Sequence, residues 1–186
     1  MGSQYWANPI VQATADGPTL TAAAAATCLP TPAVVTLPNS FFDRVGKQLR
    51  ITASGRISCV VTTPGTARFD VRLGGTVVFD SLAIPLNIVA KTNVGWWLDV
   101  LLTCRTTGSG TVATLMGQGK WTSEAGVGAV LPTVAGSAPF TLPFNSAPAV
   151  GNGFASISAL ALDLFFTQTV ATGSMTLHQY LAEEIG

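Results

Sequence analysis

The sequence predicts an all-β protein: an antiparallel β-sandwich of the jelly-roll kind, preceded by an extended N-terminal arm. Apolar and polar residues alternate along several stretches, and Gly- or Pro-containing turns separate these stretches. No stretch shows the 3.6-residue apolar period of an amphipathic helix. About eight such strands in a chain of this length indicate one sandwich domain.

Residues 1–33 are predicted to form the arm, and residues 34–186 the sandwich domain. The arm is rich in proline and in small residues, including the alanine run 22–26, and this composition favours an extended segment over a helix. Its aromatic side chains, Tyr5 and Trp6, need a surface to pack on. That surface belongs either to a neighbouring subunit or to the arm's own domain.

The first strands of the domain have the period-two alternation of half-buried antiparallel strands. From 48 to 61 the odd positions are mostly apolar, and Gly55 permits a shift of register. The stretch 67–73 is the clearest strand, because its odd positions are apolar and its even positions are charged. The glycine pair 74–75 then predicts a hairpin turn into 76–79.

The stretch 95–105 is apolar on both faces in places, as in a central strand or one that contacts another subunit. Trp96 and Trp97 must point to opposite faces of this strand. One indole is therefore expected in the core. The other is expected to anchor an interface, since Trp is enriched at interface centres; stacking on a sugar in a receptor-binding role is the alternative.

The second half of the chain has strands of uneven clarity. A strand within 111–121 is interrupted by glycines, and a short strand at 140–144 lies within an otherwise irregular region. Two regular strands, 158–167 and 172–181, close the chain. In the last of these, His178 and Tyr180 are predicted to lie on the polar face.

The low content of charged residues favours a protein that assembles with partner subunits. Hydrophobic residues make up 48% of the chain and charged residues only 10%, whereas about 25% is usual for charged residues. A surface with few charges suits a protein that buries much of its exterior against partners, because burying an unpaired charge is costly. A monomer with a neutral Ser/Thr-rich surface remains the alternative.

Several classes of partner are disfavoured. The formal net charge is zero and no Lys/Arg cluster is present, so nucleic-acid binding is not expected. No apolar stretch of about 20 residues is free of proline, and the N-terminus does not resemble a signal peptide, so we expect a soluble protein without membrane contact. The three cysteines, Cys28, Cys59 and Cys104, have no metal-like spacing and are expected to be free. Cys59 and Cys104 lie in apolar runs that are predicted strands, where a free Cys is expected to be buried.

The residue inventory disfavours catalysis. His178 is the single histidine, and no nucleophile elbow, dinucleotide fingerprint or phosphate-binding loop is present. Asp70, Asp99 and Asp163 lie on predicted strands, where any two could form a glycosidase pair, but each occupies an ordinary outward position. We therefore predict no enzyme activity, no cofactor and no metal.

Four stretches resemble small virion proteins of tailed bacteriophages. Such proteins share a Ser/Thr/Gly-rich, low-charge, all-β character, and the resemblance covers most of the chain after the arm. The stretches that carry it are 46–58, 93–97, 162–166 and 169–180.

This resemblance implies a non-enzymatic structural protein of the virion, assembled in the host cytoplasm. The first expectation is a capsid decoration (cement) or head-fibre protein, a homotrimer that binds the major capsid protein through its arm. The alternative is a tail-associated receptor binder that recognises carbohydrate or protein through the loops 106–110 or 123–153. The interface candidates are Tyr5, Trp6, Trp97, His178 and Tyr180.

Overall fold

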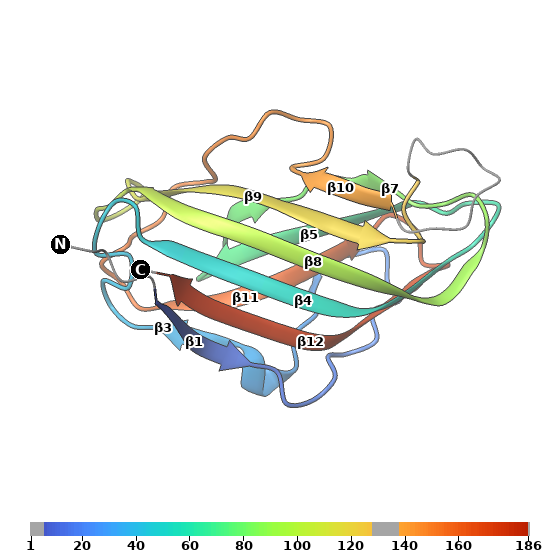
Figure 1. Cartoon of the computed structure of the whole chain (residues 1–186), viewed down its shortest axis with the longest axis horizontal. Helices are drawn as coiled ribbons and strands as arrows, with labels where there is room; N and C mark the ends of the chain where they lie inside the picture. Colours follow the sequence, from blue (N-terminus) through green and yellow to red (C-terminus); the bar gives the residue numbers. More distant parts are fainter. Residues whose placement is uncertain (1–5, 128–137, 186) are drawn as a thin grey trace.

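The computed structural model describes residues 6–127 and 138–185, which form a sandwich of two antiparallel sheets (Figure 1). Sheet A has the strand order β1-β12-β4-β8-β9-β10, and sheet B the order β2-β11-β5-β6, with β3 also paired to β11 and β7 to β5. The predicted β-sandwich is confirmed. The strands of sheet A are β1 (Ala7–Gln12), β4 (Gln48–Cys59), β8 (Lys91–Thr106), β9 (Thr114–Ser123), β10 (Ala138–Leu142) and β12 (Ser174–Ile185). Those of sheet B are β2 (Ala26–Thr27), β3 (Val35–Leu37), β5 (Thr66–Leu73), β6 (Thr76–Asp80), β7 (Ile84–Pro85) and β11 (Leu160–Gln168).

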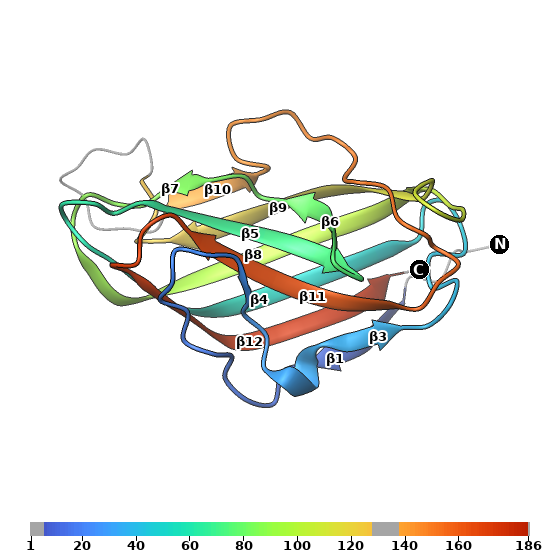
Figure 2. The same ribbon diagram turned by 180° about the vertical axis from the view of Figure 1, so that it is seen from behind.

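The core lies between the facing sides of the two sheets (Figure 2). The apolar positions predicted to share a face do so, because successive side chains of a strand point to opposite sides. Phe69 of β5 lies at the centre, with ring centroids 5.2 Å from Trp96, 6.1 Å from Trp121 and 5.2 Å from Phe166. The three cysteines are free, as expected; Cys59 and Cys104 are buried as predicted, and Cys28 is buried as well.

The narrower expectation of a jelly roll is also met: four strands of sheet A lie in the order β1-β12-β4-β8, and sheet B has the order β2-β11-β5-β6. In a jelly roll two Greek keys interleave, which distributes consecutive strands over the two sheets. β9 and β10 are an addition to this plan, since they follow β8 within sheet A as a meander. The β8–β9 connection is a short loop, 107–113, which keeps the two strands paired in the same sheet.

The described part of the predicted arm belongs to the sandwich, which is the second of the two alternatives: it packs on its own domain. β1 pairs with β12, and the segment continues along that strand through a hydrogen bond from the Leu20 N–H to the Met175 carbonyl (2.8 Å). It then crosses to sheet B, where Cys28 and Leu29 are fully buried. The reason is physical: β12 and β11 would otherwise present unpaired backbone groups at the same side of the sandwich.

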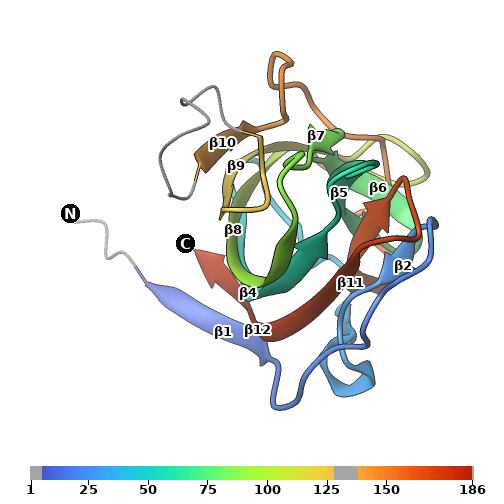
Figure 3. The same ribbon diagram turned by 90° about the vertical axis from the view of Figure 1, so that its right-hand side faces the viewer.

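The segment also contains the one helical turn of the described residues, the 3₁₀ helix η1 (Thr31–Ala33). Within the residues that the structure describes, no helix is long and apolar enough to cross a bilayer. Viewed along the sandwich, β1 projects from the edge of sheet A, away from sheet B (Figure 3).

A bulge in β12 changes the face predicted for Tyr180. Leu177 pairs with Gly55 and Gln179 with Ser54, so His178 is an extra residue in β12. Alternation is interrupted there, and Tyr180 turns into the core with only 3% of its surface exposed. Burial raises the pKa of its phenol far above the usual range. Tyr180 is therefore a core residue, and its assignment to the surface was wrong.

Gly55 makes the bulge possible. A Cβ at this position would lie 2.0 Å from the Thr176 carbonyl oxygen and 2.9 Å from the Leu177 Cα, both backbone atoms. We therefore expect Gly55→Ala to lower the free energy of unfolding by about 2–3 kcal/mol, the cost of overpacking, measured by urea denaturation. Gly95→Ala is the matched control on the adjacent strand, since a Cβ at Gly95 would have no atom within 4 Å. Equal effects at the two positions would contradict the role given to Gly55.

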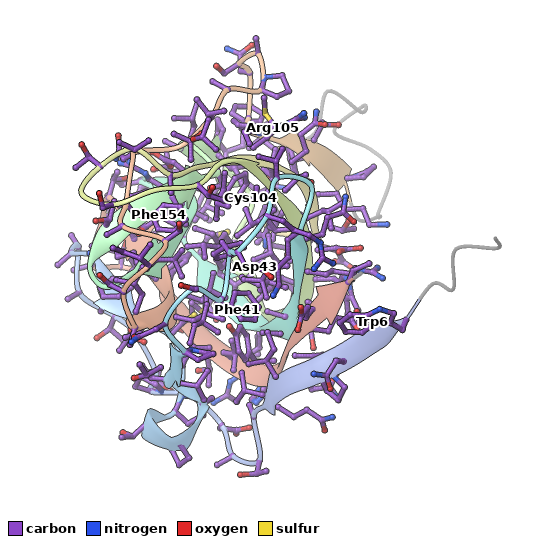
Figure 4. All side chains as sticks on the ribbon, turned by 90° about the vertical axis from the view of Figure 1, so that its left-hand side faces the viewer. Trp6, Phe41, Asp43, Cys104, Arg105 and Phe154 are labelled. Atoms are coloured by element: carbon purple, nitrogen blue, oxygen red, sulfur yellow. The ribbon has the colours of Figure 1, made fainter. Side chains whose placement is uncertain are left out.

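An aromatic cap closes the end of the sandwich nearest the two termini (Figure 4). Phe42 contacts Phe41 (4.9 Å between centroids) and Phe154 (5.7 Å). The Lys47 ammonium lies 4.3 Å from the Phe41 ring centroid and 2.8 Å from the Glu184 carboxylate. This ion pair joins the cap to β12, and it satisfies a lysine that is almost completely buried.

Candidate ligand-binding face

The outer face of sheet A carries an exposed tryptophan at its centre. Trp97 of β8 is 46% exposed, whereas its neighbour Trp96 is 3% exposed and donates its indole N–H to the Arg56 carbonyl (3.2 Å). The two indoles therefore divide between surface and core as the sequence predicts. Among the described residues the Trp97 indole N–H has no hydrogen-bond partner, so it is available to a ligand.

The backbone at Trp97 is held on both sides because β8 is an interior strand. β8 pairs with β4 over most of its length and with β9 on its other side. Trp97 lies opposite Ser54 of β4 and opposite Thr122 of β9. A backbone held by two ladders does not have to be ordered on binding, which favours affinity.

Polar side chains surround this indole. Ser54 donates a hydrogen bond to Gln179 of β12 (3.1 Å). Two positions along β8, Asp99 accepts two hydrogen bonds from the Arg50 guanidinium (3.0 and 2.8 Å). The first pair joins β4 to β12 and the second joins β4 to β8. These hydrogen bonds fix the orientation of donors and acceptors beside Trp97.

A shallow hollow of about 370 Å³ adjoins this row of side chains. It is open to solvent and is lined by Asp99, Leu101, Gln118, Gly119 and Lys120. The face therefore combines one planar apolar surface with a shallow depression lined by both polar and apolar groups. We call this combination, Trp97 with its polar neighbours and the hollow, the Trp97 face.

The predicted interface residues do not form one site. Trp6 is 43% exposed and precedes β1 at the edge of sheet A (Figure 4), with β12 and β4 between it and the strand of Trp97. His178 lies at the bulge, where its Nδ1 is 2.9 Å from a carboxylate oxygen of Asp16. Tyr180 is in the core, and Tyr5 lies outside the described residues.

The three carboxylates considered for catalysis are divided between the two sheets. Asp99 is on the Trp97 face, whereas Asp70 and Asp163 lie on adjacent strands of sheet B. The Asp70 side chain is 4% exposed, and both of its oxygens accept hydrogen bonds from Arg72. A carboxylate held in this way is not available to attack a substrate. The described residues contain no group of three His, Cys, Asp or Glu side chains placed to hold a metal ion.

Asp163 makes a testable contribution to the pH dependence of stability. Burial raises the pKa of this carboxyl above its ordinary value, despite a hydrogen bond from the Thr27 hydroxyl. The folded state therefore binds the proton more tightly than the unfolded state, whose pKa is about 3.9. Protonated Asp163 therefore stabilises the folded state fully at a pH below the unfolded-state pKa. This stabilisation is lost as the pH rises through the folded-state pKa.

We expect Asp163→Asn to remove this dependence. Relative to the variant, the wild type should be most stable near pH 4 and should lose its relative stability as the pH approaches 7. Urea denaturation of both proteins at several pH values measures the difference. A relative stability that rises with pH would mean that the folded-state pKa is lowered instead.

Sequence reasoning missed most of the polar residues on the Trp97 face. The alternation in 48–54 and 96–104 indicates which side chains point outward, but it carries no information on strand order or register. That Ser54, Gln179 and Thr122 lie beside Trp97 follows from pairing between strands that are distant in the sequence.

The fold defines the class of this protein as an antiparallel β-sandwich. No protein-family model matches the chain, and no curated protein matches it. Among solved structures, the chain is similar to the CBM2 module of the evolved Dit of Lactobacillus casei BL23 phage J-1. The identity is 12%, the TM-score is 0.33, and the match covers 81% of this chain and 67% of that one. A match of this quality carries no argument about function.

Proposed function

We propose that this chain is a non-enzymatic structural protein of a phage virion that binds the host surface through the Trp97 face. The observation that carries the proposal is the exposed indole of Trp97, on a strand paired on both sides, among polar side chains ordered by hydrogen bonds. Such a combination of a flat aromatic surface and oriented hydrogen-bonding groups is typical of binding sites. The low charge content and the resemblance to virion proteins support a place in the particle.

The test is adsorption of the purified protein to host cells. We expect Trp97→Ala to weaken cell binding by at least about tenfold, since a central Trp is a typical binding hot spot. Trp6→Ala is the matched control, because Trp6 is nearly as exposed but lies at the sheet edge. Equal binding by the wild type and Trp97→Ala would contradict the proposal.

A second candidate, capsid decoration, is favoured by a different observation. β1 is the outermost strand of sheet A, and the exposed Trp6 immediately precedes it. A free strand edge beside an aromatic side chain can pair with a shell protein by strand addition. In this role the protein, as a homotrimer, would bind the major capsid protein. Particles that lack the protein should then take up the wild type but not Trp6→Ala.

A further inference from the structure

We infer that the partner recognised by the Trp97 face is a glycan, whose chain lies along β8 from Trp97 toward the hollow beside Leu101. This inference rests on the proposed function and names the chemical class of the receptor. A sugar ring presents an apolar C–H surface above and below and hydroxyl groups around its edge. The Trp97 face offers a complement to each: a planar indole for the ring and polar groups for the hydroxyls.

The polar groups include several without partners in the protein. Within the described part of the chain, the side chains of Thr52, Thr122, Gln118 and Lys120 make no hydrogen bond or ion pair. They supply both donors and acceptors, which hydroxyl groups require because each hydroxyl donates and accepts. The nearby Arg50–Asp99 pair is already satisfied and holds the middle of the face in a fixed geometry.

The spacing along β8 favours an extended chain over a single small molecule. Trp97, Asp99 and Leu101 are alternate residues on one face, so Trp97 and Leu101 are separated by about 13 Å at the rise of a β-strand. Leu101 lines the hollow and is itself exposed. The indole and the hollow therefore form two contact points in line, with a carboxylate between them.

The same observations disfavour a protein partner. The core of a protein interface is usually apolar and depleted in charge, whereas the immediate cross-strand neighbours of Trp97 are Ser54 and Thr122. Asp99 of β8 lies opposite Lys120 of β9 in the next row of the sheet, so charged groups flank Trp97 as well. A protein covering this face would desolvate these polar groups, whereas a hydrated glycan can bond to them directly or through water.

The experiment measures binding of the full chain to host cells before and after two treatments. Periodate oxidation of cell-surface sugars should abolish binding, and protease treatment should leave it unchanged. Polysaccharide released from the same cells should compete. Trp97→Phe should retain part of the affinity, and Trp97→Leu should lose at least about tenfold, because stacking needs a planar ring.

The outcomes distinguish a failure of the glycan inference from a failure of the proposed function. Binding that protease abolishes and periodate does not would overturn the glycan inference but leave host-surface recognition intact. Binding that tolerates Trp97→Leu as well as Trp97→Phe would also overturn the inference. Failure of the wild type to bind untreated cells would contradict the proposed function itself, and the inference with it.

Discussion

A variant that lacks residues 1–33 is expected to be unfolded, whereas one that lacks only residues 1–12 is expected to fold. The longer deletion removes β2 and the fully buried side chains of Cys28 and Leu29. Each buried aliphatic side chain contributes about 1.5–3 kcal/mol. It also removes backbone hydrogen bonds to β11 and β12, leaving free the edge of β12 and the part of the β11 edge that β3 does not pair with. Together these losses approach the whole stability of a small domain, about 5–15 kcal/mol.

The shorter deletion removes the edge strand β1, in which Ile10 and Val11 are only half-buried. We expect it to cost about 1–3 kcal/mol and to leave a cooperative urea transition with a lower midpoint. Circular dichroism of both variants, in the near and far ultraviolet, measures the difference. A folded variant without residues 1–33 would show that the segment 13–33 is a dispensable arm after all.

The faces of the strands could be predicted from the sequence because they depend on a local pattern. In β5 the alternation of apolar and charged residues places Phe69 in the core with no knowledge of its neighbours. Trp96 is placed with it by the same rule, and Trp97 is placed outside. Wherever a strand is regular, period-two alternation is sufficient to assign its side chains to the inner or the outer face.

The prediction for Tyr180 failed where a strand is irregular. One inserted residue, His178, reverses the faces of everything that follows in β12, and its cause lies in the partner strand at Gly55. The placement of the N-terminal segment was left open between two alternatives for a related reason. Its attachment to β12 depends largely on backbone hydrogen bonds, such as that of Leu20 to Met175, and backbone groups leave no pattern in a sequence.

The Trp97 face could be predicted from the sequence only in part. Its single aromatic residue follows from the alternation within β8, but its polar neighbours come from β4, β9 and β12. Those strands are brought together by the order of sheet A, which the local patterns do not specify. The sequence therefore indicates a surface tryptophan, and the sheet topology makes it a site.

Phe69→Ala is expected to destabilise the domain more than any other single substitution considered. The side chain of Phe69 is fully buried and contacts the aromatic rings of Trp96, Trp121 and Phe166, which come from both sheets. Truncation of a buried Phe to Ala costs about 3–5 kcal/mol, because the cavity that remains adds to the lost transfer free energy. Urea denaturation followed by far-ultraviolet circular dichroism measures this loss.

Phe165→Ala is the control, since Phe165 pairs with Asp70 on the adjacent strand but lies on the outer face of sheet B. There the Arg72 guanidinium stacks 3.7 Å from its ring centroid, and the side chain is only half-buried. Loss of this contact and of partial burial should cost about 1–2 kcal/mol. The Trp fluorescence of Phe69→Ala should also change, because two indoles lose a neighbour, whereas that of Phe165→Ala should not. Comparable losses in the two variants would mean that the centre of the core does not lie at Phe69.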